Sequence, residues 1–207
     1  MNTDAGHRLP LEEHTRHGWR VFEVAADFEL IDAWALPATG GRDDFEDFLA
    51  VWNEMDPGAD DRSPATRLLF GLRERLGEWF GWDDGPALPI PGCTERSLHE
   101  RLPPDLPPLR PAQHSAVPFV PVFRTEFEHA AEISNATVHA VLHLAWAQRE
   151  DGMYGGQLGV LVKPRGWLGH LYMAAIAPFR YLVVYPAMMR HFGRLWRAHA
   201  GQPAPAA

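Results

Sequence analysis

The sequence predicts an α+β fold in which a curved antiparallel sheet grips a long C-terminal helix. Residues 167–196 are long and apolar enough to form that helix. Two runs of strand-like composition, 137–146 and 154–162, come directly before it. A sheet must cover its apolar face, and a helix laid across a curved sheet often leaves a cavity for a ligand.

The composition is that of an ordinary globular protein. The chain has 207 residues, of which 46% are hydrophobic and 22% charged, with a formal charge of −8. That acidic balance, with scattered arginines, argues against nucleic acid as a partner. Cys93 is the only cysteine, so neither a disulfide within the chain nor a thiolate zinc site is expected. A reducing, cytoplasmic setting fits this cysteine content.

The chain is expected to form a single domain over residues 18–199, between disordered tails at 1–17 and 200–207. No apolar leader is visible at the N-terminus. The proline-rich stretch 83–117 is interpreted as a long loop, either a lid over a pocket or a solvated connector. Cys93 lies in this loop and is expected to be inert.

One or two strands and two short helices are predicted in the N-terminal half. Residues 19–36 alternate and are rich in β-formers, and residues 43–55 and 63–80 have helical periodicity. The strand face expected to meet the core carries Phe28, Leu30, Asp32, Trp34 and Leu36.

The later strands are predicted to form a meander. A two-residue turn at Asn135–Ala136 places Glu132 opposite His139 and Glu128 opposite His143. Leu158 then pairs with Leu142. This register gives one solvent-exposed face, with the glutamates and histidines, and one apolar face that is expected to be buried.

Neither histidine is expected to bind a metal. On a strand, His139 and His143 lie about 13 Å apart, too far for one ion. Cross-strand polar pairs are the favoured interpretation. The alternative is an acid/base pair of Glu132 with His139 in a pocket. The glycines at 155, 156 and 159 indicate a bulge or the close approach of another group. No metal or other cofactor is expected.

The C-terminal helix is expected to kink near Pro178 and again near Pro186. Residues 167–189 also approach the length of a membrane span. The central Arg180 and both prolines favour a buried core helix instead.

Several segments together resemble an uncharacterised bacterial family, the domain of unknown function numbered 2867. They are FELIDAWALPATGG, SPATRLLFGLRERLGEWFGW, AEISNATVHAVLHLAW and GQLGVLVKPRGWLGHLYMAAIAPFRYLVVYPAMMR. The family is similar to the START-like (SRPBCC) helix-grip superfamily of ligand-binding proteins and polyketide cyclases. The resemblance implies a helix-grip fold and carries over no catalytic residues.

The expected function is the binding of a small apolar molecule, lipid- or polyketide-like, between the sheet and the C-terminal helix. A cyclase- or hydrolase-type enzyme using Glu132 and His139 in the same cavity is the first alternative. A membrane-associated protein anchored through 167–189 is the second. The oligomeric state stays open. The expected ligand-binding residues are Leu142, Trp146, Tyr154, Leu158, Tyr172, Met173 and Ile176.

Overall fold

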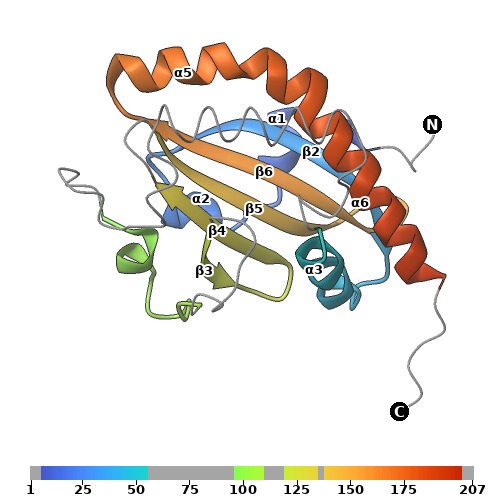
Figure 1. Ribbon diagram of the computed structural model, residues 1–207. Helices are drawn as coiled ribbons and strands as arrows, with labels where there is room; N and C mark the ends of the chain where they lie inside the picture. The colour runs from blue at the N-terminus through green and yellow to red at the C-terminus, as the bar shows by residue number, and fades with distance from the viewer. Residues whose placement is uncertain (1–5, 56–95, 110–118, 135–137, 202–207) are drawn as a thin grey trace.

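The computed structural model describes residues 6–55, 96–109, 119–134 and 138–201. It is an α+β protein with one open antiparallel sheet and a long C-terminal helix (Figure 1). The six strands have the order β1-β2-β6-β5-β4-β3. Their bounds are β1 His7–Arg8, β2 Glu29–Gly40, β3 Val120–Arg124, β4 Glu128–Ser134, β5 Val138–Gln148 and β6 Tyr154–Pro164.

Short helices lie between the first three strands along the chain, and a long helical arm follows the last strand. The short elements are α1 Leu11–Thr15, α2 Val21–Val24, α3 Phe45–Asn53 and the 3-10 turn η2 Leu98–Arg101. The helical arm consists of α5 Gly166–Phe179, the π-helix η3 Arg180–Val184 and α6 Tyr185–Ala200. The predicted helix at 43–55 is confirmed as α3. The predicted helix at 63–80 and Cys93 lie outside the described residues.

The N-terminal segment departs from the sequence prediction. Within the expected disordered tail, β1 pairs with β2, and α1 buries His14. Within the expected strand 19–36, residues 21–24 form α2, and β2 begins only at Glu29. The reason is tertiary packing, because Val21 and Val24 fill a cluster against Val141 of β5.

The predicted meander is confirmed, with a register two residues from the predicted one. Ser134 pairs with His139, and Leu142 pairs with Val160. A shift of two preserves which side chains share a face. The expected turn at Asn135–Ala136 lies outside the described residues.

The prediction of one solvent-exposed face is wrong, because both faces of the central strands are covered by other parts of the protein. The histidine face carries His139, Val141 and His143 of β5, all fully buried. It is covered by α1, α2 and the segment around η2, including Leu98 and Leu106 from the proline-rich stretch. The rest of that stretch, 83–95 and 110–117, lies outside the described residues.

The arm face is the opposite side of the sheet, with Val138, Ala140, Leu142, Leu144 and Trp146 of β5. Figure 1 shows the helical arm and α3 on this side. The arm breaks after Pro178, as predicted, because proline has no N–H to donate within the helix. Pro186 falls in the first turn of α6, where proline is well tolerated.

The strand glycines make room for side chains, and one of them lies opposite an irregularity of the neighbouring strand β2. An added Cβ at Gly159 would lie 2.5 Å from His14 Nε2, and one at Gly156 would lie 2.5 Å from Phe48 Cε2. The pairing of β5 with β6 runs through both glycines without a shift. In its pairing with β6, β2 has two register shifts. One lies between Ala35 and Thr39, opposite Gly156, and the other lies between Leu30 and Asp32 and turns them to opposite faces.

Candidate functional site

The arm face is sealed at one end. There α3 and α6 pack an aromatic core around Trp146, whose ring centroid lies 5.2 Å from Phe48 and 5.9 Å from Trp196. Leu158 is buried in the same core, and Trp146 Nε1 donates a 2.8 Å hydrogen bond to Gly41 O. This end has the dense packing of a structural core.

The middle of the arm face remains partly open. Leu142 and Val160 lie directly opposite each other on the two central strands, yet both are only half-buried. Their sequence neighbours Val141 and Leu161, on the histidine face, are fully buried. Ala140 is also half-buried. Helix α5 therefore leaves an accessible apolar surface at the centre of the sheet. In a fully packed core, the central residues of the sheet would be the most deeply buried.

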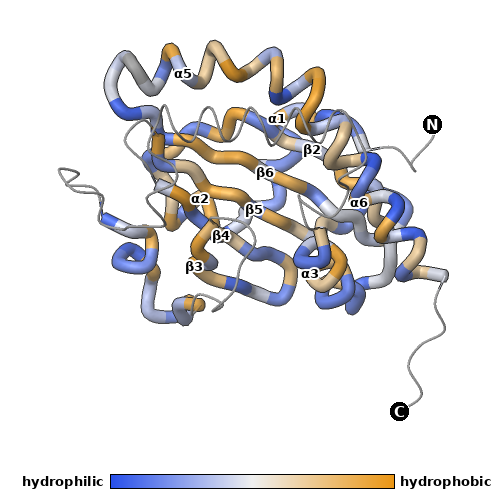
Figure 2. The backbone as a smooth tube through the Cα atoms, in the orientation of Figure 1, coloured by the Kyte–Doolittle hydropathy of each residue, from blue (hydrophilic) through white to orange (hydrophobic). Residues whose placement is uncertain are grey.

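A buried carboxylate adjoins this surface. Asp32 of β2 pairs with Val160, and Val160 pairs with Leu142, so the three side chains form one row across the arm face. Figure 2 shows hydrophobic residues along β5 and β6 beneath the helical arm. The row thus leads from an apolar centre to a single charged group.

Asp32 is held by groups from the arm. Arg180 approaches Asp32 Oδ2 at 2.8 Å, and Tyr185 Oη donates a 2.7 Å hydrogen bond to the same oxygen. Tyr181 Oη donates to Oδ1. Burial, and then the nearby Asp32 charge, raise the pKa of Tyr185, so this phenol stays protonated and acts as a donor. All three partners come from η3 or the first turn of α6, so the π-helix turns these groups toward the sheet.

Two buried donors beside Asp32 have no hydrogen-bond partner among the described residues. They are Trp34 Nε1 and Arg180 Nε. The Trp34 ring lies 4.6 Å from that of Tyr185, so it belongs to the same cluster. Buried N–H groups are nearly always paired, and an unpaired one calls for an explanation. Two such donors fit a bound group with acceptor oxygens.

The structure divides the expected ligand-binding residues between these regions. Tyr172, Met173 and Ile176 of α5 pack beside Val138, Val162 and Ala140, next to the half-open surface that Leu142 helps to form. Burial raises the pKa of Tyr172. Trp146 and Leu158 lie instead in the sealed aromatic core. Tyr154 stacks on Phe127, with centroids 5.6 Å apart.

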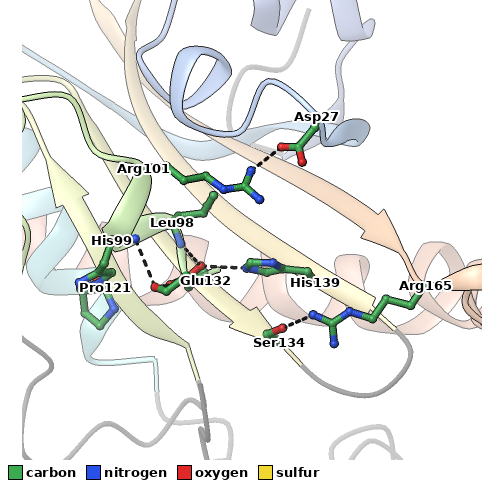
Figure 3. A network of polar contacts seen from close by, with 10 residues as sticks. Asp27, Leu98, His99, Arg101, Pro121, Glu132, Ser134, His139 and Arg165 are labelled. Atoms are coloured by element: carbon green, nitrogen blue, oxygen red, sulfur yellow. Dashed lines mark hydrogen bonds and ion pairs between the residues drawn. The ribbon is translucent and has the colours of Figure 1, made fainter. Parts of the chain in front are cut away.

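The two weak catalytic candidates lie on the histidine face, away from this site. His139 Nε2 contacts Glu132 Oε2 at 2.8 Å, although Glu132 pairs in the ladder with Val141. Figure 3 shows Glu132 between His139 and the start of η2. Leu98 N donates to Glu132 at 3.0 Å, and Ser97 Oγ donates to its other oxygen. Burial alone would raise the pKa of Glu132, but these hydrogen bonds lower it below its usual value.

A second buried polar chain lies on the histidine face. His143 Nε2 donates to Glu128 Oε2 at 3.1 Å, and its Nδ1 lies 3.0 Å from His14 Nε2. His14 Nδ1 in turn lies 2.7 Å from Gln157 Oε1. Burial, and then the neighbouring His143, lower the pKa of His14 to about 3. Both chains tie the N-terminal segment or η2 to the sheet, so their arrangement serves the fold. No metal-binding group of three or more His, Cys, Asp or Glu occurs in the described part of the chain.

The Asp32 cluster was missed by the sequence analysis, although its two charges were visible. Asp32 stands alone on an apolar strand face, and Arg180 is the one charged residue between His170 and Arg190. Two opposite charges, each isolated in an apolar run, are expected to pair when their runs pack together.

Comparison with known proteins gives a family and no named function. No curated protein and no solved structure matches the chain. The family model described as "Protein of unknown function (DUF2867)" matches residues 24–187, which include every residue of the Asp32 cluster. The chain therefore belongs to the DUF2867 family.

Proposed function

We propose that this protein binds a small apolar molecule, lipid- or polyketide-like, between the arm face and α5. The proposal rests on the row of Asp32, Val160 and Leu142, where an accessible apolar surface adjoins a polar cluster. Ligand sites commonly combine apolar walls with a few placed polar groups. We further propose that the architecture is a helix-grip fold of the START-like kind, and that the protein works in the cytoplasm, which its single cysteine fits.

The ligand has a polar end with acceptor oxygens. Trp34 Nε1 and Arg180 Nε are the donors for it, and both atoms are buried. A carboxylate or ketone oxygen would pair with either donor, while the chain of the ligand covers Leu142 and Val160. Movement of α5 about η3 gives the ligand its way in, because a π-helix has irregular hydrogen bonding and often marks a functional site.

An enzymatic role in the same site has no support from Glu132 and His139. Both are fully buried on the opposite face. The two charged groups of the proposed site, Asp32 and Arg180, are paired with each other. Binding is therefore the function that the geometry favours.

Native mass spectrometry of the purified protein tests this proposal first. We expect a co-purified molecule with an apolar chain and a carboxyl or keto group. A thermal shift series with straight-chain fatty acids is the second measurement. A ligand at about 100 times its Kd stabilises the fold by roughly 2.7 kcal/mol. No bound molecule, together with no shift across the series, would remove the binding function.

A further inference from the structure

The outward side of α5 and η3 carries an apolar stripe that remains exposed. Trp167 is 77% exposed, Leu171 56% and Leu182 77%. Ala174, Ala175 and Pro178 between them are also exposed. Figure 2 shows hydrophobic residues along the second half of α5. Exposed apolar side chains that form a continuous stripe mark an interaction surface.

The stripe belongs to one side of the helical arm. Its members recur every three or four residues, the spacing of a single helix face. In α6, Arg190, Arg194 and Arg197 have the same spacing and are also exposed. The exposed residues of the arm therefore change from apolar along α5 and η3 to basic along α6.

The charge of the sequence is divided in the same way. Residues 152–207 contain six Lys and Arg and no Asp or Glu, a net charge of +6. Residues 1–151 contain 27 acidic and 13 basic residues, a net charge of −14. An acidic body thus carries a basic arm. Basic residues beside an apolar helix face are the combination that binds anionic lipids.

We propose that the helical arm docks on the surface of an anionic lipid bilayer. Trp167, Leu171 and Leu182 insert at the boundary between headgroups and acyl chains, and the exposed arginines contact lipid phosphates. By length and composition, Gly169–Ala200 is a candidate membrane span, and only 11% of its apolar window is buried. The arm lies flat, however, because Arg180 and Tyr185 fasten it to Asp32 of the sheet.

A second copy of the chain fits this surface less well. A symmetric dimer places the same patch of both subunits together. Residues 166–200, which form the arm, contain four Arg and no Asp or Glu. Two arms of net charge +4 would then face each other, and like charges across an interface are unfavourable. The proposal concerns the outward side of α5, so it stands independently of a ligand on the inward side.

Flotation with lipid vesicles tests the proposal. We expect the protein to float with phosphatidylcholine vesicles that contain phosphatidylglycerol, to float poorly with phosphatidylcholine alone, and to be released by raised salt. Leu171→Gln combined with Leu182→Gln should lower the partition coefficient at least about tenfold, since two apolar side chains leave the lipid. Arg190→Glu combined with Arg194→Glu should lower it by a similar factor.

Met153→Gln is the matched control, because Met153 is an apolar residue 46% exposed and lies outside the arm. It should float as the unchanged protein does. Three results would overturn the proposal. One is equal binding with and without phosphatidylglycerol, and another is full binding by the leucine variant. The third is a lipid-free dimer, seen by sedimentation, that only the leucine variant dissociates; the stripe would then belong to a second copy.

Discussion

Tyr185 Oη donates a 2.7 Å hydrogen bond to Asp32 Oδ2 and so fastens the first turn of α6 to the middle of β2. Arg180, one turn earlier, reaches the same carboxylate at 2.8 Å. The arm is therefore fixed to the sheet at the junction of its two halves. Beyond the junction, α6 continues into the sealed aromatic core, whereas α5 covers the half-open centre of the sheet.

Replacing Asp32 should destabilise the protein because the Arg180 charge would lose its partner. Arg180 is only 16% exposed in its side chain. We expect Asp32→Asn to lower the free energy of unfolding by about 2–4 kcal/mol, measured by urea denaturation. Tyr185→Phe removes one hydrogen bond and should cost about 1 kcal/mol. The exposed Asp151→Asn is the control, and an equal effect from Asp32→Asn would contradict the role of the cluster.

Stability should fall as the pH falls below about 6.5, in part because of His14. Burial lowers the pKa of His14 in the folded state to about 3. Above pH 6.5 both states hold this residue neutral. Between pH 6.5 and about 3, the unfolded chain takes up a proton that the folded chain does not, so unfolding is favoured. The slope is about 1.4 kcal/mol per pH unit for one such proton.

The variant His14→Gln isolates this contribution. It should be less stable than the unchanged protein at pH 7.5, because the contacts with His143 and Gln157 are lost. Its unfolding free energy should nevertheless depend less steeply on pH, by about one proton. His170→Gln, at an exposed position of α5, is the control. Identical pH slopes for His14→Gln and the unchanged protein would show that His14 is not the group concerned.

Gly159→Ala should destabilise the sheet because its new methyl group would meet the His14 ring. The ideal Cβ would lie 2.5 Å from His14 Nε2, so the ring must move and α1 with it. Overpacking of this kind costs about 1–3 kcal/mol. At Gly41 an added Cβ meets atoms only at 3.8 Å or more, so Gly41→Ala serves as the comparison. A thermal melt of Gly159→Ala that matches that of Gly41→Ala would contradict this packing.

The sequence predicted the elements whose pattern is local. The periodicity of residues 43–55 predicted α3, and the alternation after Glu128 predicted a meander with the correct sets of side chains on each face. Pro178 predicted the break in the arm. Each of these rests on neighbouring residues or on one residue type with a fixed effect on the backbone.

The remaining features depend on contacts between distant residues. His139 and His143 were expected to face water, since nothing in their own strand shows that α1, α2 and η2 cover them. The N-terminal segment was expected to be disordered because its composition is polar, yet its few apolar residues and His14 are what seal the histidine face. Asp32 and Arg180 are 148 residues apart and meet only through the packing of the arm on β2.

Binding of decanoate to two matched variants tests the central claim most directly. Ala140 is half-buried on the arm face beneath α5, whereas Ala174 is exposed on the outward side of the same helix. We predict that Ala140→Phe fills the site and weakens binding at least about tenfold, a loss of about 1.4 kcal/mol, by isothermal titration calorimetry. Ala174→Phe should bind as the unchanged protein does. Unchanged affinity in Ala140→Phe, with its fold intact by melting temperature, would contradict a ligand site between the sheet and α5.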